Sequence, residues 1–248
     1  MKLDTGCSRF GVPSGRPAVR MAKELSHIPG IELVGILSHE CAYGEASAEG
    51  VTRLAIECAS AMSDTARLLR EDGIPIKDVV LGATPTARPL CENISRFPEV
   101  TEIHPGAYVL GDRTYVNTFS MSENDCAATV IVTVVSTPGP GRACVDGGAK
   151  TFGADPLLFM AGRAGGVDTW APTYGSVKGR PDIRIERLSE EVGVLALTDQ
   201  AKGVSIGDRL QILPNHVSLA VNLHDKMYGI RNGVVEREIP VSARGMDR

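Results

Sequence analysis

Val79-Val80-Leu81-Gly82-Ala83-Thr84-Pro85-Thr86 runs from an apolar strand through a loop of small residues into the start of a helix. Such a loop exposes backbone N–H groups and hydroxyls at a helix N-terminus, an arrangement that suits an anion such as a phosphate. Short apolar runs alternate with amphipathic stretches on both sides of this motif, from Met1 to about Gly111. This alternation predicts βαβ units around a parallel sheet.

Helices and strands are expected at regular intervals through this first half. The clearest helix covers 51–70, where apolar residues recur at helical spacing and Gly73 supplies a stop signal. Two further amphipathic stretches, at 17–27 and 86–96, complete the expected helices. Four apolar runs predict the strands, at 2–4, 31–38, 78–81 and 100–110.

The pattern changes after about Ser122 to β-branched runs that are broken by Gly and Pro. Turn signals stand at 137–141 and 231–233. We therefore expect two domains, 1–122 and 123–248, the second a mostly antiparallel β domain. Its strands are expected at 127–135, 143–145, 192–197, 209–213, 217–222, 227–230 and 234–241.

Composition excludes several classes of partner. The 248 residues are 43% hydrophobic and 23% charged, with a formal net charge of −4 and no basic stripe, so we expect no nucleic acid and no anionic membrane as partner. No apolar run approaches the ~20 residues of a membrane-spanning helix, and no apolar signal segment follows Met1. The expected location is therefore the cytoplasm, and the scattered cysteines are expected to be reduced thiols.

Two motifs before the phosphate-type loop carry polar side chains at strand ends. Leu3-Asp4-Thr5-Gly6-Cys7-Ser8-Arg9-Phe10-Gly11 is a strand end followed by a loop that projects Arg9, and the apolar run 35–38 ends in His39. An Asp4–Arg9 pair that stabilises a turn is an alternative interpretation of the first motif. A structural histidine is the alternative for the second.

A fourth motif, Thr101-Glu102-Ile103-His104-Pro105-Gly106-Ala107-Tyr108-Val109, follows the phosphate-type loop. Together, in this order, the four motifs resemble those that follow barrel strands five to eight in alanine racemase and in the D-threonine aldolase and D-serine dehydratase group. The implied fold is α/β: the second half of an alanine-racemase-like (β/α)8 barrel, followed by the β domain. Strands one to four, with the lysine that binds the cofactor covalently, are then expected to be missing from this chain.

The resemblance implies pyridoxal 5′-phosphate as cofactor. It places Arg9 close to the cofactor's phenolic oxygen, where a permanent positive charge stabilises the ionised form, and His39 near the pyridine ring. His104 takes the position that faces the pyridine nitrogen in alanine racemase. The residues assigned to cofactor binding are Gly82, Ala83, Thr84, His104, Gly106, Ala107 and Tyr108.

The segment Pro214-Asn215-His216-Val217-Ser218 is similar to the motif that gives those lyases two ligands of a divalent metal, Mn or Zn. Alternate residues of a strand share one face, so His216 and Ser218 are expected to point at one ion. The family has Cys or Asp at the second position, and a neutral Ser hydroxyl is a far weaker ligand. A structural imidazole is the alternative interpretation of His216. Lys150 lies in the β domain and is not expected to bind the cofactor covalently.

The activity implied by the resemblance is metal-assisted cleavage of a small D-3-hydroxy amino acid to glycine and an aldehyde, as in D-threonine aldolase. Deamination as in D-serine dehydratase is one alternative. A non-catalytic remnant that binds phosphate compounds or pairs with another chain is a second alternative, from a different class. The expected assembly is a homodimer, or a complex with a partner that supplies the missing half-barrel.

Overall fold

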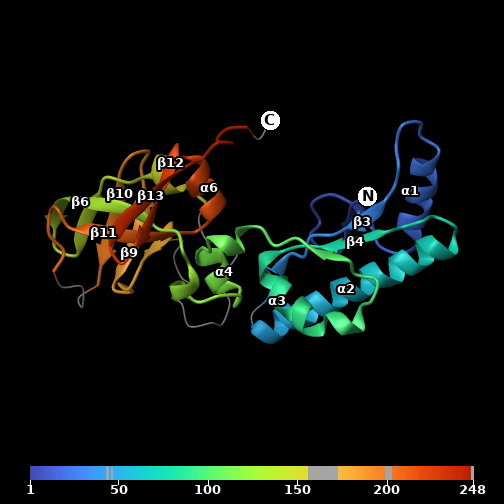
Figure 1. Cartoon of the computed structure of the whole chain (residues 1–248). Coiled ribbons are helices and arrows are strands. Elements are labelled where there is room, and N and C mark those ends of the chain that lie inside the picture. The colour runs from blue at the N-terminus through green and yellow to red at the C-terminus, as the bar shows by residue number, and fades with distance from the viewer. Residues whose placement is uncertain (43–44, 46, 156–172, 199–202, 247–248) are drawn as a thin grey trace. The chain divides into compact units, whose positions relative to one another are not determined.

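The computed structural model describes residues 1–42, 45, 47–155, 173–198 and 203–246. The chain separates into two compact units, and many of their elements are labelled in Figure 1. The first unit comprises Met1–Tyr108 and Thr118–Ser120, and the second comprises Val109–Asn117 and Met121–Arg248.

A parallel sheet forms the centre of the first unit, as the sequence predicts. Its strands pair in the order β3-β4-β5, and β1 is joined to β3 through a parallel bridge between Lys2 and Leu37. β1 also pairs in parallel with the short β2. The strands are β1 (Leu3–Asp4), β2 (Val12–Pro13), β3 (Gly35–Leu37), β4 (Asp78–Leu81) and β5 (Glu102–Ile103).

Three helices pack against this sheet through one apolar core. They are α1 (Arg16–Ser26), α2 (Ala48–Glu71) and α3 (Thr84–Asn93), and the 3-10 turn η2 (Ile94–Arg96) follows α3. The α2 helix begins where the Ser47 side chain accepts a hydrogen bond from the Gly50 N–H at 3.1 Å, an N-cap that satisfies one free amide. Its buried core positions recur at helical spacing and are Cys58, Ala59, Met62, Ala66 and Leu69.

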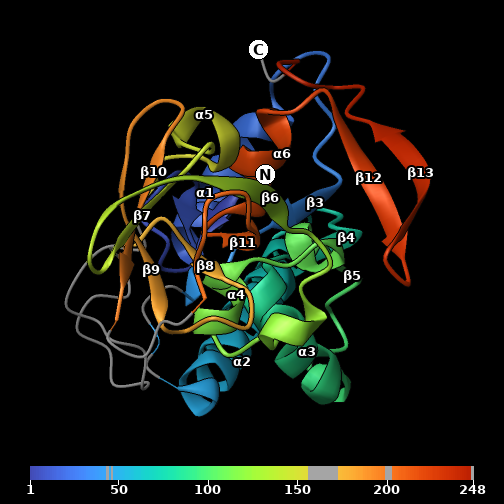
Figure 2. The same cartoon turned by 90° about the vertical axis from the view of Figure 1, so that its left-hand side faces the viewer.

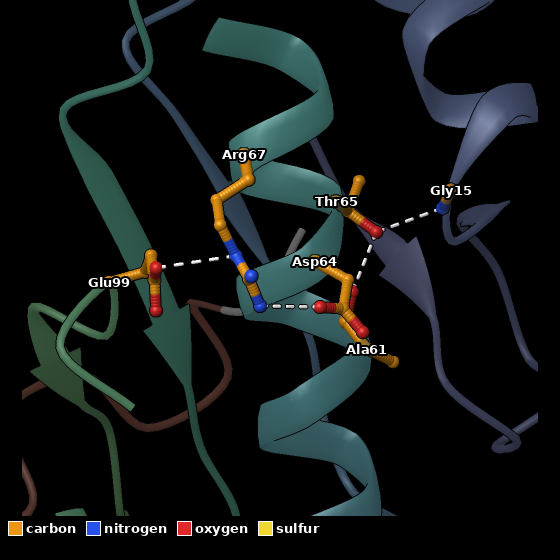
Figure 3. A network of polar contacts seen from close by, with 6 residues as sticks. All are labelled: Gly15, Ala61, Asp64, Thr65, Arg67 and Glu99. Carbon is orange, nitrogen blue, oxygen red and sulfur yellow. Dashed lines mark hydrogen bonds and ion pairs between the residues drawn. The ribbon is translucent and has the colours of Figure 1, made fainter. Parts of the chain in front are cut away.

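Polar contacts fix α2 to its neighbours (Figure 3). The Thr65 hydroxyl accepts a hydrogen bond from the Gly15 N–H at 2.8 Å and donates to the Ala61 carbonyl at 2.7 Å. Because Thr65 is completely buried, this pairing removes an otherwise unsatisfied polar group and sets the start of α1 against the middle of α2. Arg67 forms ion pairs with Asp64 and Glu99.

The strand expected at 100–110 is much shorter in the structure. β5 ends at Ile103, and the chain then passes through Pro105 and Gly106 into a 3-10 turn, η3 (Ala107–Val109). Proline has no N–H to donate to a sheet ladder, so the strand cannot continue through residue 105. The prediction for 104–110 was therefore wrong, although the Pro-Gly pair was visible in the sequence.

The second unit is built around a closed barrel with the strand order β10-β7-β6-β11-β8-β9, and all its pairs are antiparallel (Figure 2). This confirms the expected antiparallel β domain. The strands are β6 (Val130–Gly139), β7 (Arg142–Val145), β8 (Gly175–Val177), β9 (Ile183–Leu188), β10 (Gly193–Leu197) and β11 (Arg209–Pro214). The core includes Val132, Val134, Val145, Ile185, Leu195 and Ile212.

Two barrel strands, β8 and β9, were not expected from the sequence. A signal was present in β9, where apolar and charged residues alternate and the apolar Ile183 and Ile185 are buried. β8 has only three residues, which is too few to show an alternation of apolar and polar residues. Its place in the barrel is set by pairing with β11 and β9.

The strand expected at 217–222 is a helix, α6 (Val217–Asn222). His216 is its N-cap residue, and the Asp112 carboxylate accepts a hydrogen bond from the Val217 N–H at 2.9 Å. A long-range contact therefore caps the helix and outweighs the β propensity of its two valines. The other short helices of this unit are α4 (Arg113–Asn117), η4 (Glu123–Asp125) and α5 (Ala149–Phe152).

A separate hairpin of β12 (Lys226–Arg231) and β13 (Val234–Pro240) follows α6 and stands beside the barrel (Figure 2). Asn232 and Gly233, with φ of 51° and 77°, form the predicted turn, because both central positions of a type I′ turn need positive φ. Within the parts of the chain that are described, no helix has the length and apolar character needed to cross a membrane.

Candidate functional site

Loops at one edge of the parallel sheet carry the predicted cofactor residues. The carboxyl ends of β1, β3, β4 and β5 meet at this edge because the strands are parallel. The Thr5 hydroxyl lies 2.6 Å from the Ser38 hydroxyl, which joins the loop after β1 to the end of β3. The segments after these strands, including the start of α3 and the turn η3, contain Arg9, His39, Gly82, Ala83, Thr84, His104, Gly106, Ala107 and Tyr108.

Asp4, at the end of β1, shapes the loop that carries Arg9. Its Oδ1 accepts hydrogen bonds from the N–H groups of Gly6 at 2.9 Å and Ser8 at 3.1 Å. These bonds, that from Gly6 above all, hold the pKa of Asp4 below its ordinary value. In the described residues no ion pair joins Asp4 to Arg9, so backbone amides and not that pair stabilise the turn. Arg9 is exposed, with its guanidinium 5.2 Å from the ring centroid of Phe10.

His39 is half-buried at the end of β3, with Nδ1 2.6 Å from the carbonyl oxygen of Gly82. A carbonyl can only accept, so Nδ1 carries the proton and Nε2 keeps its lone pair. Burial lowers the pKa of His39, and the positive charges of Arg9 and Lys2 add to this effect against the opposing bond to Gly82. The ring is therefore a neutral imidazole in a fixed tautomer, beside the loop after β4.

The N-terminus of α3 is buried and lacks a side-chain cap. Ala83 occupies the N-cap position and forms no side-chain hydrogen bond there, while Thr84 and Thr86 are 8% and 1% exposed. Amides in the first turn of a helix have no partner within the helix and carry partial positive charge. Both properties suit an anion at this end of α3.

The two glycines that were assigned to cofactor binding, Gly82 and Gly106, differ in their surroundings. A Cβ on Gly82 would lie 2.7 Å from the His104 carbonyl oxygen, so glycine is needed where β4 and β5 approach each other. A Cβ on Gly106 would meet nothing within 4 Å, and Gly106 has no positive φ. The chain's own packing gives no reason for glycine at 106. The open space beside its backbone is what the close approach of another molecule requires.

His104 and Tyr108 lie on either side of Gly106 in the sequence, in the segment after β5. Both side chains are more than half exposed, and His104 Nε2 lies 2.7 Å from Glu102 Oε2. Ala107 begins the 3-10 turn between them. Both rings are therefore available for contact with a bound molecule.

Glu40, a buried acid beside this site, was not assigned a role in the sequence interpretation. It directly follows His39, is 2% exposed, and its Oε2 accepts a hydrogen bond from the Thr86 hydroxyl at 3.0 Å. Its other oxygen, Oε1, is buried without a hydrogen-bond partner. Burial raises the pKa of Glu40 and outweighs the hydrogen bonds that oppose this rise. The sequence signal that could have indicated this residue is a charged side chain directly after an apolar strand.

The second unit contains the predicted metal residues and a buried acid that organises them. Asp112 is completely buried and accepts hydrogen bonds from the N–H groups of Val217 at 2.9 Å and Tyr115 at 3.1 Å. Burial raises the pKa of Asp112, against those bonds and the smaller electrostatic effect of His216. Asp112 thus holds the starts of α4 and α6, and its contact with α6, 105 residues away, has no short-range sequence signal.

Asn215 and Asp155 lie beside His216. The Asn215 Nδ2 donates to the carbonyls of Asp155 at 2.9 Å and Thr173 at 2.6 Å, while Asn215 Oδ1 and Asp155 Oδ1 are buried without partners. Burial raises the pKa of Asp155, and the electrostatic effect of His216 opposes that rise. Two unsatisfied buried oxygens near one imidazole mark a place where a donor or a cation is favourable.

His216 and Ser218 were expected to point at one metal ion because they would share a strand face, and the structure corrects this reason. His216 is the half-buried N-cap of α6 and Ser218 is exposed in its first turn, so the two do not share a strand face. In the described part of the chain no three His, Cys, Asp or Glu side chains gather as a metal site. These residues alone therefore do not make a complete site for a metal ion.

Two family models match successive parts of the chain. The alanine racemase N-terminal domain matches residues 1–114, and the putative serine dehydratase domain matches residues 127–230. The chain belongs to the family of D-threonine aldolase and D-serine dehydratase. Its first unit thus has an alanine-racemase-like fold, and the relatives in this family are lyases.

Individual relatives match all or most of the chain but are longer. D-threonine aldolase of Arthrobacter sp is 27% identical over 256 residues, covering 100% of this chain and 61% of the relative. D-threo-3-hydroxyaspartate dehydratase of Delftia sp. (strain HT23) is 30% identical over 225 residues, covering 87% and 58%. The chain spans about three fifths of the length of such relatives.

A solved structure agrees with these matches. A Cys→Ala variant of D-threo-3-hydroxyaspartate dehydratase, in the metal-free form, superposes with a TM-score of 0.82 at 27% identity, covering 97% of this chain and 64% of that one.

Proposed function

We propose that the chain forms part of a pyridoxal-phosphate-dependent lyase for D-3-hydroxy amino acids, with cleavage to glycine and an aldehyde as its reaction. The observation that carries this proposal is the uncapped, buried start of α3 beside the open backbone of Gly106. Membership of a family of D-amino-acid aldolases and dehydratases supplies the substrate class.

The residues of the first unit fit the cofactor. The first-turn amides of α3 with those of Gly106 and Ala107 suit its phosphate, and Tyr108 borders the same space. Arg9 supplies a permanent cation for the phenolic oxygen, and His104 is the candidate for the pyridine nitrogen. Bound pyridoxal phosphate supplies an electron sink for the electrons of the broken Cα–Cβ bond.

His39 has the chemistry of an orienting group. The neutral ring donates through Nδ1 to the Gly82 carbonyl, so its plane is fixed and Nε2 can accept a hydrogen bond. Because the His39 ring is neutral, the positive charge of Arg9 is the main electrostatic influence on the cofactor's phenolic oxygen. The residues of this chain thus bind, orient and set charge.

His216 is proposed as a ligand of a divalent metal, Mn or Zn, with Ser218 as a weak second ligand. The related dehydratase variant was solved in a metal-free form, which indicates a metal in that relative, and the unpartnered oxygens of Asn215 and Asp155 favour a cation near His216. Because the described residues do not complete a site, no reaction step is assigned to the metal.

Deamination of the same substrates is the second candidate, because a dehydratase is among the relatives with the highest identity. His224, directly after α6, has a structural role: its Nε2 lies 2.7 Å from the Thr151 carbonyl and joins α6 to α5. Products separate the two reactions, since D-threonine gives glycine and acetaldehyde in one and a 2-oxo acid with ammonia in the other.

The assembly is proposed to be a homodimer, or a complex with a partner polypeptide that completes the barrel. In the described residues the sheet β3-β4-β5 ends at β5, whose outer edge has no strand beside it. Such an edge pairs readily with another strand. The proposed partner supplies the lysine that carries the cofactor.

Amide NMR of the full chain during titration with pyridoxine 5′-phosphate, which lacks the reactive aldehyde, tests the proposal. We expect the largest shifts at Thr84, Thr86, Gly106 and Ala107. Shifts confined to other segments, or no saturable shifts, would contradict the proposed cofactor site.

A further inference from the structure

Glu40 places a carboxyl group against the first turn of α3, inside the protein. It is 2% exposed, and its Oε2 lies 3.0 Å from the Thr86 hydroxyl oxygen, which is itself 1% exposed. Thr86 is the third residue of α3. The carboxyl therefore lies next to the amides that are proposed to hold the cofactor's phosphate.

Counting protons around Thr86 indicates which form of Glu40 the geometry favours. The Thr86 hydroxyl oxygen lies within hydrogen-bond distance of two oxygens, Glu40 Oε2 at 3.0 Å and the Ala83 carbonyl at 3.2 Å. A hydroxyl has one proton, so it cannot fully serve both acceptors. If Glu40 carries a proton, it donates to Thr86, and Thr86 donates to Ala83. The chain of bonds is then complete.

The groups around Glu40 supply no compensating cation. The neutral His39 precedes it, and Cys58 faces it from α2, where burial, with smaller effects of Glu40 and Glu57, raises the pKa of the Cys58 thiol to about 11. In the described residues no Lys or Arg forms an ion pair with Glu40. An ionised carboxylate with one buried oxygen unpartnered and no cation is unfavourable.

We propose that Glu40 is a positioning residue, held as a neutral carboxylic acid that orders the first turn of α3 and leaves its amides free to bind a dianion. The identity of the dianion as the cofactor's phosphate rests on the proposed function. The charge of an ionised Glu40 would repel the dianion and cancel the attraction of the helix N-terminus. Dianion binding therefore takes up a proton wherever Glu40 is partly ionised.

Sulfate is the appropriate probe, because it stays a dianion from mildly acidic to alkaline pH. Calorimetry on the full chain should show that the affinity for sulfate falls by about tenfold or more as pH rises and Glu40 ionises. Glu40→Gln keeps the size of the side chain, and its amide can donate to Thr86. This variant should lose most of the pH dependence, with only the part due to histidines remaining.

Glu92→Gln is the matched control, because it removes the same charge near the other end of α3, where Glu92 pairs with Arg88 in solvent. The affinity of this variant for sulfate should have the same pH dependence as that of the unmodified chain. Equal pH dependence in the Glu40→Gln chain and the unmodified chain would overturn the proposal.

Infrared spectroscopy detects the proton on Glu40 directly, and it distinguishes a failure of the protonated Glu40 from a failure of the proposed phosphate site. The unmodified chain should show a buried carboxylic-acid C=O band that sulfate strengthens at a pH where Glu40 is half ionised. Absence of the band overturns the proposal without touching the phosphate site. A band that is present while sulfate binds at no pH contradicts the proposed site, and with it the dianion part of this proposal.

Discussion

The carboxylate of Asp112 caps a helix that begins 105 residues later, at Val217, through a 2.9 Å hydrogen bond to the Val217 N–H. The same carboxylate accepts from the Tyr115 N–H, so one buried side chain fixes the starts of α4 and α6. His216 is the N-cap of α6, and the position of its imidazole therefore depends on Asp112.

Replacement of Asp112 by Ala should lower the free energy of unfolding of the chain by roughly 2 kcal/mol. Each of the two buried amides that lose their acceptor costs ~1–3 kcal/mol of stability. Part of this loss is offset because the variant no longer buries a carboxyl group. Urea denaturation measures the change. Asp125→Ala, which removes a cap from the exposed turn η4, should cost less. Equal losses would show that the Asp112 bonds do not set the stability of this region.

Zinc binding should strengthen when Ser218 is replaced by Cys. A thiolate adds charge and a soft donor near His216, and about tenfold higher affinity or more is expected in calorimetric titration. Leu219→Cys, at the exposed neighbouring position, is the control for a thiol elsewhere on α6. An equal gain in both variants would mean that position 218 does not face an ion with His216.

Lys150 should not become the covalent anchor of pyridoxal phosphate. It forms ion pairs with Glu190 and Glu191, and the hydrogen bond to Glu190, then that to Glu191, raises the pKa of Lys150, which keeps the amine protonated and non-nucleophilic. Borohydride reduction of the chain with the cofactor, followed by peptide mapping, checks this. Stoichiometric labelling of Lys150 would contradict it.

Local patterns in the sequence were sufficient for the elements that depend on them. The helix at 51–70 and the strand at 78–81 follow from periodicity, and the turn at Asn232-Gly233 follows from residues that tolerate positive φ. The helix at 217–222 could not be predicted in this way, because a side chain from residue 112 determines it.

The same distinction between local and long-range determinants applies to the candidate site. The small-residue loop into α3 and the Pro-Gly pair at 105–106 could be found because backbone geometry requires those residue types locally. The roles of Glu40 and Asp155 could not, because burial and missing partners are properties of the folded chain.

The stability of the chain at neutral and alkaline pH should rise when Glu40 is replaced by Gln. Burial raises the pKa of folded Glu40 above its ordinary 4.5, so the folded state binds its proton more tightly than the unfolded state. The stabilisation from that proton is complete below the unfolded pKa and is lost as pH rises through the folded pKa. Thermal melts across pH should show this loss in the unmodified chain and not in Glu40→Gln. Parallel curves would contradict a protonated Glu40.

The affinity of pyridoxine 5′-phosphate for the full chain and for its Gly106→Val and Gly139→Val variants tests the cofactor site most directly. Neither glycine has positive φ, and a Cβ at either position meets nothing within 4 Å, so both variants should fold. Valine at 106 fills the space assigned to the phosphate, whereas 139 lies in the β6–β7 hairpin of the other unit. We predict that Gly106→Val weakens binding by about tenfold or more while Gly139→Val leaves it unchanged. Equal affinity of all three proteins would contradict the account.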